Sequence, residues 1–227
     1  MSTDQRREQT AEGSTWQGVV ADWASDRETF PVPWGKLMMW VFLVGDTFIF
    51  SIFLVAYMAV RTAAVEPWPS TEELFAMTVG GVEFPLLLIA IMTFILITSS
   101  GTMALAVKFG YEGDKKKTVL FMALTALLGL SFLGMQAYEW TELIVNKDIR
   151  PWGNPYGAEQ FGAVFFMVTG FHGLHVLGGV ILLTVVAIKV HKGHYDRKGY
   201  DVVETTGLYW HFVDLVWVFI FAFFYLL

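Results

Sequence analysis

The stretch FGAVFFMVTGFHGLHVLGGVILLTVVAI, residues 161–188, contains no Asp, Glu, Lys or Arg, and its only titratable side chains are two histidines. An apolar helix of roughly 20 residues is long enough to cross about 30 Å of membrane hydrocarbon. Four further stretches meet this condition, and each is bounded by charged residues, proline or glycine: residues 37–60, 85–107, 118–138 and 207–227. The sequence therefore predicts an all-α, polytopic membrane protein in which residues 37–227 form one bundle of five transmembrane helices.

The overall composition narrows the function classes. Hydrophobic residues make up 55% of the chain and charged residues 16%, which is unlike an ordinary soluble domain. Cysteine is absent, which excludes an iron–sulfur cluster, a covalently attached c-type heme and any disulfide. No stretch has the spacing of a phosphate-binding glycine loop, a nucleophile–base triad or a zinc site, and no nucleic-acid partner is expected.

The placement of positive charge predicts the orientation of the helices. Residues 1–36 are polar and lack the apolar core of a signal peptide, so we expect a cytoplasmic N-terminal segment. Twelve of the 15 Lys and Arg residues then lie on the same side as this segment, and only Arg61, Lys147 and Arg150 lie on the other. Because cytoplasmic loops are enriched in Lys and Arg, the sequence predicts a cytoplasmic N-terminus and a periplasmic C-terminus.

Ionisable side chains inside the predicted helices are candidate functional residues, because they are costly at membrane depth unless they face protein or water. His172 and His175 lie three residues apart on the fourth predicted helix, and His211 and Asp214 do so on the fifth. From the rise per residue, His175 and Asp214 fall at similar depths. We therefore expect these two helices to pack together, with His175 and His211 near Asp214. We interpret the four residues as a structural polar cluster without a metal; a heme held by two histidines stays an alternative.

Asp46 is the only charged residue inside the first predicted helix and lies about 14 Å along it. One interpretation is an acid that exchanges protons or contacts lipid. The other is a protonated Asp that forms a hydrogen bond with a Ser or Thr of a neighbouring helix.

Glu139 and Glu142 form a second acidic feature, at the outer end of the third predicted helix. They are three residues apart and therefore share one helix face. A close pair of carboxylates can bind a cation or share a proton. Their place at the membrane boundary favours an interfacial role.

Four motifs, in order along the chain, carry a resemblance to a known family. GFHGLHVLGG (residues 170–179) and YWHFVDLVW (residues 209–217) are the specific ones. PLLL followed by SSG (residues 85–101) and QAYEW (residues 136–140) are weaker alone. On these motifs, residues 36–227 resemble the heme–copper oxidase subunit III family, typified by subunit III of cytochrome c oxidase.

This resemblance implies an accessory subunit of a respiratory, proton-pumping terminal oxidase in a bacterial-type inner membrane, without a catalytic or redox centre of its own. It implies direct binding to subunit I, which holds the heme and copper, and association with subunit II. It also implies bound phospholipid and a role in proton uptake. Typical members carry a Glu at the position of Asp46, which makes Asp46 the candidate proton- or lipid-linked acid. Two helices at the start of typical members have no counterpart here.

Several alternatives stay open at this point. The resemblance also covers subunits of quinol oxidases and proteins associated with nitric-oxide reductases. From a different class, an independent proton-linked transporter could use Asp46, Glu139 and the His/Asp cluster, although no internal repeat supports it. A small b-type cytochrome is the remaining possibility.

Overall fold

The computed structural model of the chain describes residues 33–79, 82–84, 86–195 and 199–227. The chain divides into two compact units, Met1–Met38 and Met39–Leu227, and all sites discussed below lie in the second unit. Most of the predicted cytoplasmic segment, residues 1–36, lies outside the described residues. Its location and the orientation of the two termini therefore stay predictions.

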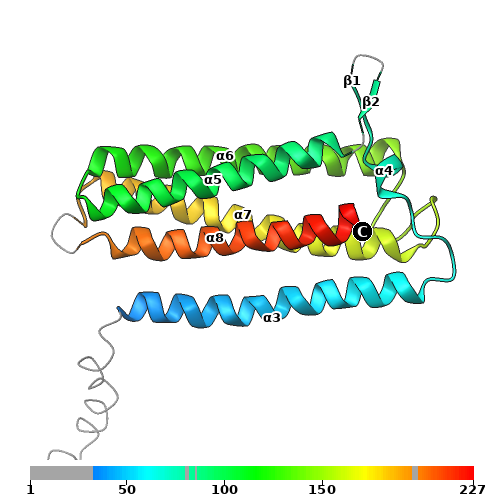
Figure 1. Cartoon of the computed structure of the whole chain (residues 1–227), viewed down its shortest axis with the longest axis horizontal. Coiled ribbons are helices and arrows are strands. Elements are labelled where there is room, and N and C mark those ends of the chain that lie inside the picture. The colour runs from blue at the N-terminus through cyan, green and yellow to red at the C-terminus, as the bar shows by residue number, and fades with distance from the viewer. Residues whose placement is uncertain (1–32, 80–81, 85, 196–198) are drawn as a thin grey trace, which may run out of the picture. The chain divides into compact units, whose positions relative to one another are not determined.

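Five long helices dominate the second unit and are labelled in Figure 1. They are α3 (Trp34–Ala63), α5 (Leu87–Tyr111), α6 (Lys115–Thr141), α7 (Gln160–His191) and α8 (Asp201–Phe221). Each is long and apolar enough to cross a membrane, which confirms the predicted five-helix membrane protein. The largest difference in bounds is at α8, which begins at Asp201 rather than Gly207. Backbone hydrogen bonds continue a helix past the apolar stretch, so hydrophobicity alone misses its polar first turns.

The shorter elements lie in the connections and at helix ends. Between α3 and α5 come α4 (Thr71–Leu74) and an antiparallel hairpin of β1 (Met77–Val79) and β2 (Val82–Phe84). Two π-helical turns, Glu142–Asn146 and Ala222–Leu226, extend α6 and α8. The sequence analysis did not predict the hairpin, because strands of three residues are too short to show a period-2 pattern. The all-α prediction holds for the membrane helices.

Four of the helices form a bundle in which each packs on two others. α5 packs on α6, α6 on α7, α7 on α8, and α8 on α5, as the side-by-side ribbons in Figure 1 illustrate. Polar side chains connect them at several levels. Thr102 of α5 lies 2.8 Å from Thr125 of α6, and the Gln136 side chain of α6 donates to the Thr169 carbonyl of α7 at 2.7 Å. Such interhelical hydrogen bonds stabilise helix packing where there is no water to compete.

Trp210 of α8 lies at the centre of this bundle and is only 1% exposed. Its indole Nε1 donates to Ser99 Oγ of α5 at 2.9 Å. Small residues make room for the ring: a Cβ at Gly129 of α6 would lie 2.5 Å from Trp210 Cη2, and one at Gly179 of α7 would lie 2.9 Å from the ring. Glycines on two helices thus allow the backbones to approach around one large side chain.

α3 contacts the bundle differently. Along its backbone it comes less close to the other described helices than the four bundle helices come to one another. Aromatic side chains fill the intervening space: the Phe50 and Phe171 ring centroids are 5.3 Å apart, and those of Tyr57 and Phe224 are 3.9 Å apart. The contact between α3 and the bundle therefore depends on individual side chains, and one of these is Asp46.

Asp114 begins α6 as its N-cap, outside the membrane-spanning segments, because its Oδ1 accepts from the backbone N–H of Lys117 at 3.1 Å. This hydrogen bond holds the pKa of Asp114 below its ordinary value of 3.8. A lowered pKa means that the folded state favours the carboxylate, so the stabilisation is present above pH 3.8 and is lost as the pH falls through the lower, folded-state value. We expect Asp114→Asn, which keeps a capping oxygen, to unfold at a lower temperature than the parent at neutral pH and at the same temperature in acid. Thermal unfolding across an acid titration measures this; a difference that persists in acid contradicts it.

Candidate functional site

The most unusual pair of polar side chains joins α3 to the bundle. Asp46 Oδ2 of α3 lies 3.2 Å from His175 Nε2 of α7, and the two side chains are 4% and 15% exposed. The rings of Phe50 and Phe171 lie against the imidazole, with centroids 5.3 and 4.7 Å away. The pair is therefore a close acid–imidazole contact enclosed by aromatic side chains.

The hydrogen bonds of His175 define what this contact can do chemically. Its Nδ1 lies 2.8 Å from the carbonyl oxygen of Phe171. A carbonyl oxygen only accepts, so Nδ1 carries a hydrogen. In a neutral ring Nε2 then has a lone pair, and a hydrogen bond to Asp46 requires the proton on the carboxyl group. In a charged ring the proton is on Nε2 and Asp46 is ionised. If a hydrogen bond joins these two atoms, its proton therefore belongs either to the Asp46 carboxyl group or to His175 Nε2.

His172 lies one helical turn from His175, but in a different environment. It is 0% exposed, its ring stacks on Trp217 at a centroid distance of 5.2 Å, and Phe132 meets it edge-on at 5.8 Å. Neither ring nitrogen has a hydrogen-bond partner. His172 therefore acts in the described structure as an aromatic packing residue of the α7–α8 contact.

His211 and Asp214 lie on the face of α8 that meets α5. Ser100 Oγ of α5 is 2.8 Å from His211 Nδ1, and Asp214 Oδ1 is buried without a hydrogen-bond partner. α7 and α8 do pack together, as expected. The expected grouping of His175 with Asp214 is corrected, however, because the acid next to His175 is Asp46. His211 does lie near Asp214, as expected, and its Nδ1 also contacts Ser100. Of the two interpretations of Asp46, the hydrogen bond to a Ser or Thr is not found in the described residues, and an imidazole lies there instead.

The two predicted interfacial carboxylates have different surroundings. Glu139 is only 4% exposed, and Tyr225 donates its hydroxyl hydrogen to Glu139 Oε1 at 3.0 Å. Glu142 is half-buried and accepts from Asn146 Nδ2 at 2.6 Å. The shared face predicted from their spacing is present, since both line one cavity. Glu139 is thus covered by Tyr225 of the π-helical turn Ala222–Leu226, and its place at the outer membrane boundary stays a prediction.

Sequence reasoning missed the hydroxyl and indole partners of these residues. Ser100 follows Ser99 in α5, and the two hydroxyls meet two successive residues of α8, His211 and Trp210. Tyr225, which contacts Glu139, lies 86 residues later in the sequence. A pair of serines in an apolar span was the available signal for an α5–α8 contact. Nothing in the sequence identified Tyr225 as the partner of Glu139.

Known proteins resemble this chain over nearly its whole length. The family model of cytochrome c oxidase subunit III matches residues 15–227. A cytochrome c oxidase subunit 3 of Alkalihalophilus pseudofirmus is 32% identical over 191 residues, which cover 84% of this chain and 85% of the relative. A cytochrome c oxidase subunit 3 of Bacillus sp. (strain PS3) is 33% identical over 191 residues and 84% of each chain.

A third relative is named after a different electron donor, quinol instead of cytochrome c. The protein described as a probable quinol oxidase subunit 3 of Staphylococcus aureus is 30% identical over 197 residues, which cover 87% of this chain and 90% of the relative. The aligned region covers most of each relative, and the range matched by the family model includes all five membrane helices. The chain belongs to the cytochrome c oxidase subunit III family, the third subunits of heme–copper terminal oxidases.

Proposed function

We propose that this chain is a non-redox accessory subunit that binds subunit I of a terminal oxidase, associates with subunit II, carries phospholipid and supports proton uptake through Asp46. The observation that supports the proton role is the Asp46–His175 contact, in which a buried carboxyl oxygen lies 3.2 Å from an imidazole nitrogen. An acid–imidazole pair can pass a proton without a large change in geometry, because either partner can carry it.

The three histidines of the membrane helices lie in different surroundings. His172, His175 and His211 have three different sets of neighbours: Trp217, Asp46 and Ser100. Within the described residues, no group of three or more His, Asp or Glu side chains is placed to hold a metal ion. In this proposal, oxidation and reduction take place in subunits I and II, as the family membership implies.

Exposed apolar side chains support the proposed contacts with lipid and partner subunits. On α3, Phe48 is 67% exposed and Val55 is 69% exposed. On α7, Leu174 is 66% exposed. Such surfaces are stable only against lipid or another membrane subunit. Cytochrome c and quinol both stay candidate electron donors of the complex, since relatives of both descriptions match.

The test of the proton role is Asp46→Asn in the assembled oxidase. Asn fills the same space and its amide can donate to His175 Nε2, but it cannot release a proton at physiological pH. We expect normal assembly and heme content, slower proton uptake and earlier inactivation during turnover. Proton uptake by stopped flow and activity loss during continuous turnover measure these effects.

Asp148→Asn is the matched control. Asp148 is an exposed carboxylate paired with Arg150 at 2.8 Å, far in sequence from the α3 contact. We expect the control to behave like the parent. If Asp46→Asn shows unchanged proton uptake and turnover lifetime, the functional interpretation of Asp46 is wrong and the pair only connects α3 to α7.

A further inference from the structure

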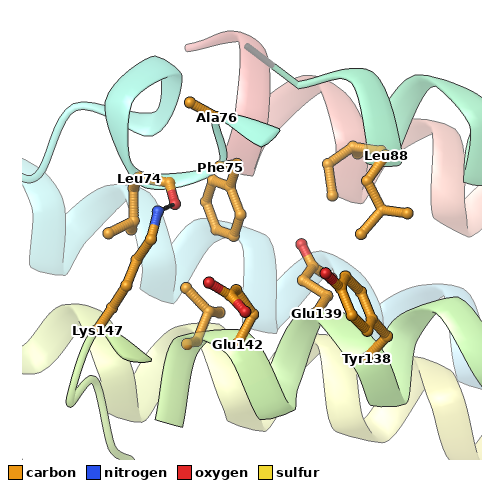
Figure 2. A pocket seen from close by; sticks show the side chains of 10 residues that line it. Leu74, Phe75, Ala76, Leu88, Tyr138, Glu139, Glu142 and Lys147 are labelled. Carbon is orange, nitrogen blue, oxygen red and sulfur yellow. Dashed lines mark hydrogen bonds between the residues drawn. The ribbon is translucent and has the colours of Figure 1, made fainter. Parts of the chain in front are cut away.

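A cavity of about 270 Å³ lies at the end of α6, apart from the Asp46–His175 pair. Figure 2 shows the carboxyl groups of Glu139 and Glu142 on the same side of α6, facing Phe75 and Leu88. Tyr138 and Lys147 complete the polar side. The apolar side consists of Leu74, Phe75, Ala76, Leu88, Ile89 and Leu143. The cavity is thus amphipathic, with two acids on one wall and hydrocarbon on the other.

Glu139 lacks a full set of partners in this cavity. Tyr225 satisfies Oε1, but Oε2 is buried and has no hydrogen-bond partner. A buried, unpaired carboxylate oxygen is strongly unfavourable. Glu139 therefore requires either a proton of its own or a cation supplied by the cavity. A cation in the cavity would lie beside both acids, because Glu139 and Glu142 line the same space.

The charges of the described lining residues indicate the charge of a cation that would suit the cavity. Glu139 and Glu142 carry two negative charges when both are ionised and Lys147 carries one positive charge, so among the described lining residues one negative charge is in excess. The Lys147 ammonium donates to the Leu74 carbonyl at the edge of the space. A single monovalent cation therefore balances the site.

The lining favours an organic ammonium over calcium or magnesium. Calcium and magnesium take six or more oxygen ligands, and the described residues offer no cluster of three or more acidic or imidazole side chains. An alkylammonium needs only a few acceptors for its three N–H donors, and the carboxylates of Glu139 and Glu142 with the Tyr138 hydroxyl supply them. The apolar wall suits a hydrocarbon body, and aromatic faces attract cations further.

We propose that this cavity binds a primary amine, with its ammonium group between Glu139 and Glu142 and its alkyl part against Leu88 and Ile89. The same chemistry is present in the headgroup of an aminophospholipid and in a free alkylamine. The site shares no residue with the Asp46–His175 pair, so this inference does not depend on the proposed proton role.

Calorimetric titration of the complex, purified through a tag on this chain into phosphatidylglycerol nanodiscs, tests the proposal with butylamine as the probe. We expect saturable binding that weakens at least about 10-fold in Glu139→Gln and in Glu142→Gln, since each loses a charge-assisted hydrogen bond. 1-Butanol, which has the alkyl part without the ammonium, should bind at least about 10-fold more weakly than butylamine. Glu66→Gln, an exposed acid outside the lining, is the control and should bind like the parent.

Three results would overturn the proposal: no saturable binding of butylamine, equal binding of 1-butanol, or unchanged binding in a folded Glu139→Gln protein. If Glu139→Gln does not assemble, Glu142→Gln decides, because the Glu142 side chain is only half-buried and its replacement disturbs the packing less. Replacing part of the phosphatidylglycerol with phosphatidylethanolamine then separates the two sources. Weaker apparent butylamine binding identifies the lipid headgroup as the natural occupant, and unchanged binding identifies a free amine.

Discussion

Trp210→Ala is expected to lower the free energy of unfolding of this subunit by about 3–5 kcal/mol, the range for removing a large aromatic side chain from a packed core. The ring is 1% exposed and lies against Gly129 and Gly179, so its removal leaves a void between three helices. The Ser99 hydroxyl also loses the hydrogen bond that it accepts from the indole N–H.

Denaturant titration of the purified complex in detergent measures the loss of unfolding free energy. In cells, the same loss should lower the yield of heme-containing complex. Trp152→Ala is the matched control, because Trp152 is 81% exposed and its removal leaves no cavity. Equal stability of the Trp210 and Trp152 variants would contradict the packing described for the bundle.

Gly129→Ala is expected to destabilise the subunit by about 1–3 kcal/mol, the usual effect of overfilling a packed core. The new methyl carbon would lie 2.5 Å from Trp210 Cη2 and 2.8 Å from Val180 Cγ2, so α6 must move away from α7 and α8. Thermal unfolding in detergent measures the effect. Gly134→Ala is the control on the same helix, because no atom lies within 4 Å of the added carbon. It should be neutral or gain up to about 1 kcal/mol of helix propensity.

A double variant shows whether the Trp210 ring causes this destabilisation. Trp210→Phe removes the outer ring atoms nearest to Gly129, so Gly129→Ala should be less harmful in combination with Trp210→Phe than alone. Additive effects of the two substitutions would mean that the clash lies elsewhere.

The membrane helices could be predicted because their length and polarity are set by the bilayer, not by the particular fold. The thickness of the hydrocarbon requires about 20 apolar residues, and each helix satisfies its own backbone hydrogen bonds. Each of the five apolar stretches accordingly lies in one helix. The exact ends were less predictable, as the early start of α8 at Asp201 shows.

The partners inside the bundle were harder to predict, because the rise per residue gives the depth of a side chain but not the helix beside it. Asp46, His175 and Asp214 all fall in the cytoplasmic half on the predicted topology. Depth alone could not decide which acid His175 meets. Asp46 is the acid beside His175 because α3 packs next to α7 through Phe50 and Phe171. The spacing of residues along the sequence does not show which helices are neighbours.

The burial of Glu139 depends on a segment far from it in the sequence. Its position at the end of an apolar stretch favoured water as its neighbour. Tyr225, 86 residues further along the chain, covers it instead. Only the position of the π-helical turn Ala222–Leu226 at the end of α8 brings Tyr225 to Glu139 of α6.

The central claim, an accessory role in a heme–copper oxidase, is tested most directly by purifying the complex in mild detergent through a tag on this chain. Optical redox difference spectra and mass spectrometry of the purified material are the readouts. We predict heme absorbance together with a large multi-helix, histidine-rich subunit I, and the other subunits recovered identify the electron donor. A colourless chain recovered without any heme-binding partner would contradict the account.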